Sequence, residues 1–144
     1  MIREANIQDF DELLKLYVHL HPELVLENSN QIEEVWMKIL SYPNYHMIVA
    51  RKDQKIVSSC MIVIIPNLTH HLRPYVVVEN VMTHENYRNQ GLASSCLDFA
   101  KKIAQENNCY KIMLMTGSKR ESTLRFYENA RYNRVDKTGF VMWL

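Results

Sequence analysis

Glycine is scarce in this sequence, which has only Gly91, Gly117 and Gly139 among its 144 residues. Neither the G-x-G-x-x-G turn of dinucleotide-binding folds nor the G-x-x-x-x-G-K-[ST] phosphate loop can be written with them. Collagen-like and glycine-rich linker segments are excluded for the same reason. Any phosphate site in this chain must therefore be built in another way.

Cysteine is also scarce, and Cys60, Cys96 and Cys109 are widely spaced. An odd number without a C-x-x-C pair disfavours a disulfide framework and a cysteine-based zinc site. We therefore expect reduced thiols that pack as small apolar groups, as in a cytoplasmic protein.

An excess of charge of one sign and a long apolar run are both missing. The sequence has 17 Lys and Arg against 16 Asp and Glu, a net charge of +1. This balance disfavours nucleic acid or an anionic membrane as the main partner. Arg3 and Glu4 stand where a signal peptide needs apolar residues. No apolar run approaches the roughly 20 residues of a membrane span.

The length of 144 residues fits one domain, residues 1–144, with an ordinary apolar content of 47%. Periodicity predicts alternating helices and strands with short connections. Strands are expected at 1–4, 45–50, 56–65, 75–83, 110–116, 132–135 and 140–144, and helices at 7–20, 30–41, 91–107 and 120–131. Three pairs have a spacing typical of helix starts: Asn6 with Asp9, Asn30 with Glu33, and Ser118 with Glu121.

The order of these elements predicts a mixed α/β (α+β) fold. Segments 75–83, 91–107 and 110–116 read as a right-handed parallel crossover, and the remaining strands as antiparallel. The expected sheet has six to seven strands and is flanked by about four helices. The apolar segment 140–144 would complete this sheet in a final hairpin or pair with another chain, which raises a homodimer as one arrangement.

A candidate anion site lies between strand 75–83 and helix 91–107. The first turn of a helix has N–H groups without intrahelical acceptors and carries the positive end of the dipole. The small residues Gly91 and Ala93 would let an anion approach that backbone, and Arg88 adds a guanidinium suited to phosphate. These features predict a pyrophosphate seat, and a plain surface turn is the alternative reading.

The motif Arg88-x-x-Gly91-x-Ala93 resembles the Q/R-x-x-G-x-G/A signature of the GNAT superfamily of acyl-CoA-dependent N-acetyltransferases. Residues 79–87 resemble the central strand and loop of that family, and residues 124–132 resemble its second motif. The resemblance implies an acetyl-CoA-dependent acetyltransferase. Main-chain groups of Arg88, Asn89, Gln90, Gly91, Leu92, Ala93 and Ser94 would bind the pyrophosphate, and those of Val81, Met82 and Thr83 would pair with the pantetheine arm.

Two side chains are candidates for acid–base work. Glu79 follows an apolar strand directly, and desolvation there would make its carboxylate a stronger base, acting directly or through a water. Tyr127 matches the family tyrosine whose phenol protonates the coenzyme A sulfur. A backbone N–H, such as that of Val81, would stabilise the oxyanion. An ion-paired edge Glu and a half-buried structural Tyr are the alternative readings.

Two positions depart from the family pattern. Arg131 precedes Tyr132 where the family commonly has Gly, so a turn with positive φ would be strained. Gly117 stands where a polar Asn is common. The six histidines show no metal-binding spacing, and no metal is expected. His19 and His21 are candidates for lining the acceptor pocket.

Two functions remain open at this stage. The first is transfer of an acetyl group from acetyl-CoA to a small-molecule or peptide amine by direct attack in a ternary complex. The second is a non-catalytic acyl-CoA-binding or regulatory module on the same fold. The sequence does not identify the acceptor.

Overall fold

The computed structural model describes residues 1–26 and 29–144. Their sheet has the strand order β1-β2-β3-β4-β5, and only the β4–β5 pair is parallel. This mixed sheet confirms the predicted fold class, although the described residues form five strands rather than six or seven. In chain order the elements are β1 (Ile2–Glu4), η1 (Ile7–Asp9), α1 (Phe10–Leu20), η2 (Pro22–Leu26), α2 (Ser29–Ser41), β2 (Tyr45–Lys52), β3 (Lys55–Ile65), β4 (Tyr75–Thr83), η3 (Glu85–Tyr87), α3 (Leu92–Glu106), β5 (Ile112–Leu114) and α4 (Glu121–Asn129).

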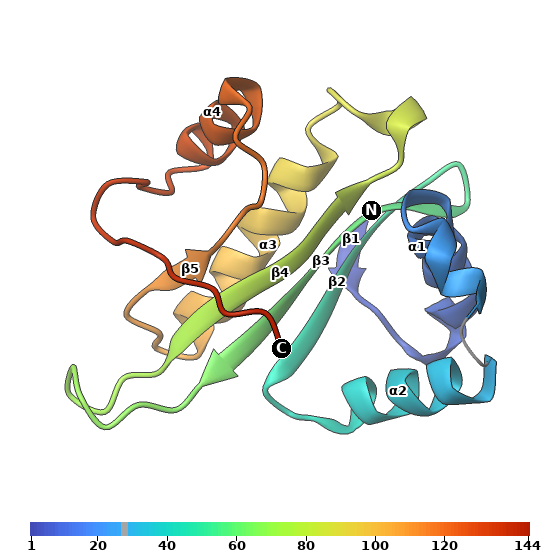
Figure 1. Ribbon diagram of the computed structural model, residues 1–144. Helices are drawn as coiled ribbons and strands as arrows, with labels where there is room; N and C mark the ends of the chain where they lie inside the picture. The colour runs from blue at the N-terminus through green and yellow to red at the C-terminus, as the bar shows by residue number, and fades with distance from the viewer. Residues whose placement is uncertain (27–28) are drawn as a thin grey trace.

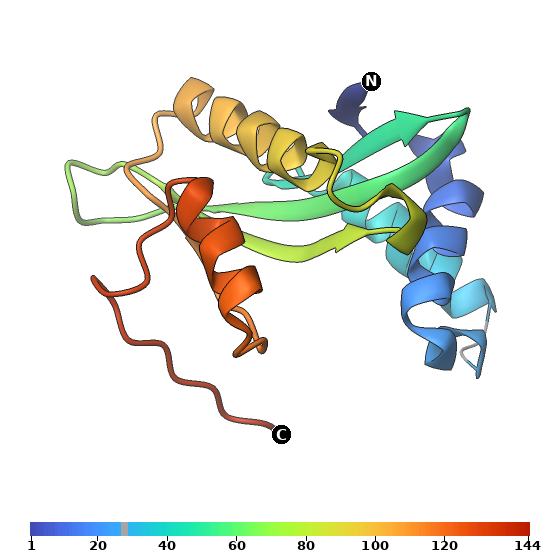
Figure 2. The same cartoon turned by 90° about the horizontal axis from the view of Figure 1, so that it is seen from above.

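Helices cover the sheet on both faces. α3 packs on one face and α1 and α2 on the other, while α4 lies at the β5 end of the sheet (Figures 1 and 2). Adjacent residues of β2 show this division, because Ile48 joins the core under α3 and Val49 joins the core under α1 and α2. Burial on both faces explains why β2 and β3 show no polar alternation.

Helix α1 is anchored to the sheet by a buried carboxylate. Asn6 and Asp9 form the predicted capping pair at the start of η1. Asp9 is 1% exposed, and its carboxylate accepts hydrogen bonds from Arg3 of β1 and Arg51 of β2. The bond from Arg3 is the main cause that lowers the pKa of Asp9. The cap thus also ties the first helix to two strands.

Two predicted helix starts differ from the structure. α4 begins at Glu121, so Ser118 is not its cap; the Ser118 hydroxyl accepts from the Arg120 amide and donates to Thr123. Glu121 binds Arg125 and Arg134 instead of closing a capping box. α2 begins at Ser29, which places Asn30 inside the helix, a difference of the size common at helix ends.

The predicted final hairpin is wrong for the described residues. Residues 132–135 form no strand, because the Asn133 side chain accepts from the amides of Val135 and Asp136 and closes a local turn. Arg134 is held against α4 by Glu128 at 2.9 Å. Residues 140–144 also form no strand. β5 is likewise shorter than the predicted 110–116.

Candidate active site

The loop between β4 and α3 opens the N-terminus of α3 towards solvent. Gly91 is the N-cap residue with φ +75°, and Asn89 also has a positive φ of 60°. A Cβ at Gly91 would meet nothing within 4 Å, so backbone conformation rather than space favours glycine there. No side chain caps α3 and its first turn has no acidic residue, which leaves the positive end of the helix available to an anion.

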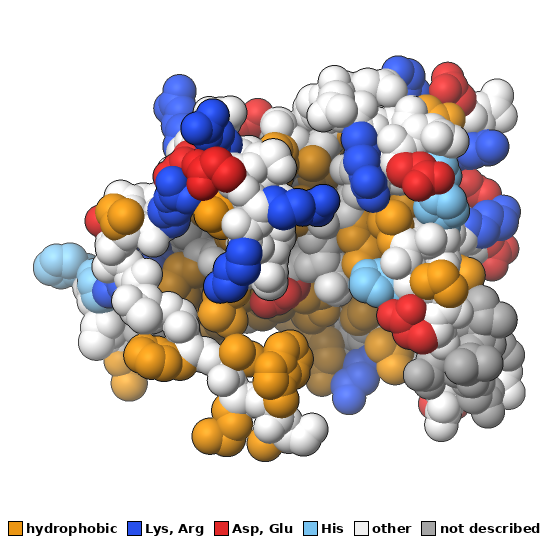
Figure 3. Space-filling view, turned by 45° about the horizontal axis from the view of Figure 1, so that its top comes forward, with side chains coloured by type: hydrophobic (Ala, Val, Ile, Leu, Met, Phe, Trp, Pro, Cys, Tyr) orange, Lys and Arg blue, Asp and Glu red, His pale blue; other side chains and the backbone are white. Residues whose placement is uncertain are grey.

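Cationic side chains flank this loop. The Arg88 Nε donates to the Thr83 carbonyl at 3.3 Å, which ties the exposed guanidinium to the end of β4. Lys52, at the end of β2, donates to the Gln90 side chain at 2.6 Å. Lys52 was missed by the sequence analysis, since it lies 38 residues before Gln90 and only the fold brings the two together. The face of Figure 3 shows Lys and Arg side chains around a hollowed surface.

Strands β4 and β5 separate below this loop. They pair only at Val76–Val78 with Ile112–Leu114, whereas β4 continues to Thr83. The His84 amide donates to the Val57 carbonyl of β3, so by alternation Met82 also turns its backbone towards β3. The backbone N–H and C=O groups of Val81 and Thr83 therefore point away from β3, to the side on which β4 is no longer paired with β5. On this side β4 continues past the last β5 pair to Thr83, and the loop that precedes α3 follows it.

A bulge bends β4 where it is no longer paired with β5. Met61 pairs with Glu79 and Ser59 with Met82, so Asn80 and Val81 together oppose Cys60. Asn80 has a positive φ of 51°, a conformation that Asn tolerates better than most residues. The bulge follows Glu79 directly, and it interrupts the pairing of Val81 with β3.

Glu79 of β4 and Tyr127 of α4 interact electrostatically. Burial is the main cause that raises the pKa of the Tyr127 phenol, and the negative charge of Glu79 raises it further. The Glu79 charge also raises the pKa of Tyr45, after burial. Tyr127 is half-buried, but Glu79 is exposed, so the expected desolvation of this carboxylate is not found. An exposed carboxylate exchanges protons most readily through water.

Tyr127 is held in place by the turn after α4. Arg131 adopts φ +71°, a conformation that favours glycine and is strained for arginine. This turn lets the Tyr132 amide donate to the Tyr127 carbonyl at 3.0 Å. The rings of Tyr127 and Tyr132 then meet edge to face with centroids 6.2 Å apart, and Phe126 packs on the other side at 4.9 Å.

A pocket of about 440 Å³ lies between α1, the start of β3 and η3. His19 and His84 stack there with ring centroids 4.2 Å apart, and His19 also faces Glu85 at 3.7 Å. His19 therefore lines a pocket, whereas His21 pairs with Glu23 outside it. Within residues 1–26 and 29–144, no group of three or more acidic, His or Cys side chains is arranged for a metal.

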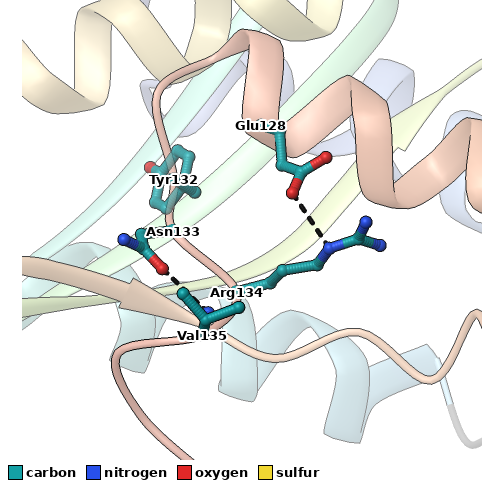
Figure 4. Close-up of a pocket in the computed structure, with 5 residues that line it drawn as sticks. All are labelled: Glu128, Tyr132, Asn133, Arg134 and Val135. Atoms are coloured by element: carbon teal, nitrogen blue, oxygen red, sulfur yellow. Dashed lines mark hydrogen bonds and ion pairs between the residues drawn. The ribbon is translucent and has the colours of Figure 1, made fainter.

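A second pocket, of about 330 Å³, lies between the end of α4 and the chain that follows it (Figure 4). Its lining includes Glu128, Arg134 and Val135 but neither Glu79 nor Tyr127. It is therefore separate from the candidate acid–base pair.

None of the helices described here is long and apolar enough to cross a membrane.

One family model matches most of the chain, and several solved structures share its fold. A family model described as the acetyltransferase (GNAT) family matches residues 10–131. A proposed acetyltransferase from Agrobacterium tumefaciens is 33% identical with a TM-score of 0.91, over 100% of this chain and 99% of that chain. A transcriptional regulator from Bacillus halodurans is 26% identical with a TM-score of 0.87, over 100% and 99%. The protein AAC(6')-Iy, solved with the bisubstrate analogue CoA-S-monomethyl-acetylneamine, shares the fold at 14% identity and a TM-score of 0.82, over 100% and 97%.

Proposed function

The chain belongs to the GNAT acetyltransferase family, and we propose that it transfers an acetyl group from acetyl-CoA to a primary amine. The observation that carries this proposal is the uncapped N-terminus of α3, which follows the stretch of β4 that is not paired with β5. A long ligand with a diphosphate at one end and a reactive thioester at the other fits such a path. One structural neighbour is bound to an analogue that contains CoA.

The cofactor would lie along main-chain groups. The pyrophosphate would bind the amides of residues 88–94, with Arg88 and Lys52 supplying positive charge. The pantetheine arm would pair with the backbone of Val81 and with the Thr83 amide in the manner of an added strand, since the Thr83 carbonyl already accepts from Arg88. Because these contacts are made by the backbone, apolar side chains at those positions are compatible with binding.

Acetyl transfer needs a proton acceptor, an oxyanion donor and a proton donor. Glu79 would accept the proton of the attacking ammonium through a water, which leaves a lone pair for attack on the thioester carbonyl carbon. The Val81 amide would stabilise the oxyanion that forms. As the carbon–sulfur bond breaks, Tyr127 would donate its phenolic proton to the departing thiolate. The raised pKa of this phenol keeps it protonated at neutral pH.

Direct attack in a ternary complex agrees with the positions of the cysteines. Cys60 and Cys96 are fully buried in the core under α3. Their mutual contact, and then burial, raise the pKa of Cys60, while the same contact lowers the pKa of Cys96. Cys109 lies after α3, before β5, and partial burial raises the pKa of its thiol. Two thiols sealed in the core and a third that stays protonated are poor nucleophiles, which disfavours an acetyl-cysteine intermediate.

The test is release of free thiol from acetyl-CoA across a panel of amines that includes amino sugars, polyamines, aminoalkyl compounds and peptide N-termini. Calorimetry with CoA and acetyl-CoA measures binding independently. We expect binding with both ligands and thiol release with one class of amine. If calorimetry detects no heat of binding at millimolar CoA or acetyl-CoA, the proposal is overturned.

A second candidate is a non-catalytic acyl-CoA-binding or regulatory module. It is favoured by the 26% identity to a protein described as a transcriptional regulator. Binding of acetyl-CoA without thiol release from any amine of the panel would support this candidate over the enzyme.

A further inference from the structure

Residues Phe140–Leu144 form an extended apolar arm that leaves the body of the molecule. Every one of these five side chains is at least 64% exposed, and the arm belongs to no helix or strand. In Figure 1 the arm crosses in front of β5 and β4, and Figure 2 shows that it ends away from the sheet. Apolar side chains stand out at the lower edge of Figure 3. Single exposed apolar residues are ordinary, but five adjacent ones mark an interaction site.

The edge of β5 is open in the part of the chain that the structure describes. β5 is the last strand of the sheet, and it pairs with β4 alone. The Val76 amide donates to the Lys111 carbonyl, so alternation turns the backbone groups of Ile112 and Leu114 away from β4. Met115, directly after β5, is 61% exposed. An open edge of this kind pairs readily with an added strand.

The arm starts beside the end of β5, but it does not run along that strand. A Cβ on Gly139 would lie 3.1 Å from the Met115 sulfur, so the arm starts beside the end of β5. The preceding turn is fixed to α4 by Arg134, which binds Glu121 and Glu128. From this fixed start the arm points outwards, and pairing with its own β5 would require a reversal at Gly139.

We propose that the arm adds as a strand to the β5 edge of a second copy, which returns its own arm in the same way. Each chain carries both the apolar arm and the unpaired β5 edge. Two copies can therefore exchange arms reciprocally and form a closed two-fold dimer without another kind of protein. Two arms of five large side chains, with the surfaces that they cover, bury on the order of 1,500 Å², the size of a stable interface.

The first test is the mass of the protein in solution, measured by sedimentation velocity over a concentration series from about 1 to about 100 μM, because the dimer fraction depends on concentration. We expect a species of twice the 17.1 kDa chain mass. The double variant F140K/W143K should sediment as a monomer with an unchanged far-ultraviolet circular dichroism spectrum. A matched control, L68K/L72K, alters two equally exposed leucines on the β3–β4 loop and should remain a dimer. A monomeric wild type, or a dimeric arm variant, would overturn the proposal.

The second test follows Trp143 itself. Trp36 is buried at 5% exposure, so quenching by iodide reports mainly on Trp143, which is 88% exposed in the free arm. We expect Trp143 to be shielded in the dimer and to become accessible when dilution produces the monomer. A shielded Trp143 in a monomer would instead assign the arm to its own β5, and an accessible Trp143 in the dimer would place the interface elsewhere. Neither measurement depends on acetyl transfer.

Discussion

Burial raises the pKa of the Tyr127 phenol on α4, and the negative charge of Glu79 on β4 raises it further. The bulge at Asn80 bends the strand just after Glu79, and the turn at Arg131 holds Tyr132 against Tyr127. Two local backbone features therefore shape the strand that carries the carboxylate and the helix end that carries the phenol. A proton acceptor and a proton donor within electrostatic reach of each other are what acetyl transfer requires.

Replacing Tyr127 by Phe removes the proposed proton donor. We expect kcat to fall by roughly 100-fold, the lower range for loss of a general acid, while the Kd for acetyl-CoA stays unchanged. Because the pKa of this phenol is raised above its ordinary value of 10.0, the alkaline loss of kcat in the wild type should begin above pH 10. Steady-state thiol release against pH measures both effects. Tyr132→Phe is the control, and an equal loss there would remove the role of Tyr127.

Glu79→Gln removes the proposed proton acceptor. Since Glu79 is exposed and acts through water, we expect kcat/KM at pH 7 to fall by roughly 100-fold. Raising the pH towards the pKa of the acceptor amine should restore much of the rate, because the amine then loses its proton unaided. The control is Glu106→Gln, an exposed carboxylate at the end of α3. A pH-independent loss in Glu79→Gln would contradict the assignment of a base.

The sequence predicted the fold class and the main parts of the candidate site, because periodicity and motif spacing are local properties. The bounds of β4 were predicted, those of α3 to within one residue, and the end of α1, although α1 itself begins only after η1. The strained φ of Arg131 was anticipated from a single departure in a motif. The exposure of Glu79 was not predicted, since an apolar strand does not show where its covering helices end. Lys52 was missed because its partner Gln90 is distant in the sequence.

The final hairpin was predicted wrongly for a physical reason. The apolar character of residues 140–144 was read correctly, but a strand also needs a partner edge within reach. The turn closed by Asn133 and the ion pair of Arg134 with Glu128 direct the chain outwards. Side-chain contacts of this kind override the β-propensity of a short segment.

Asp9→Asn should destabilise the fold because it leaves Arg3 and Arg51 without their shared carboxylate. Removing one partner of a buried ion pair costs about 3–5 kcal/mol, and the partial exposure of both arginines reduces the expected loss to about 2–3 kcal/mol. Chemical denaturation measures this change. Asp11→Asn, at an exposed position in the first turn of α1, should change the free energy of unfolding by less than about 0.5 kcal/mol.

The same carboxylate predicts an acid-dependent stability. The folded-state pKa of Asp9 is lowered, so its contribution is fully present above the unfolded pKa of about 3.9 and is lost as pH falls through the folded value. The stability difference between wild type and Asp9→Asn should therefore narrow below about pH 4. A difference that stays constant down to pH 2 would show that Asp9 acts by packing alone.

Gly91→Ala tests whether the open helix end binds the diphosphate. A Cβ at Gly91 meets no atom within 4 Å, so the substitution acts through the positive φ, at a cost of about 1 kcal/mol. Distortion of the first turn of α3 should weaken binding of CoA by roughly threefold to tenfold in calorimetry. Gly117→Ala is the matched control, because that glycine has open space around it and no positive φ, and it should leave CoA affinity unchanged. If both variants bind CoA as the wild type does, the diphosphate is held elsewhere, and the proposed path of the cofactor along β4 would lose its starting point.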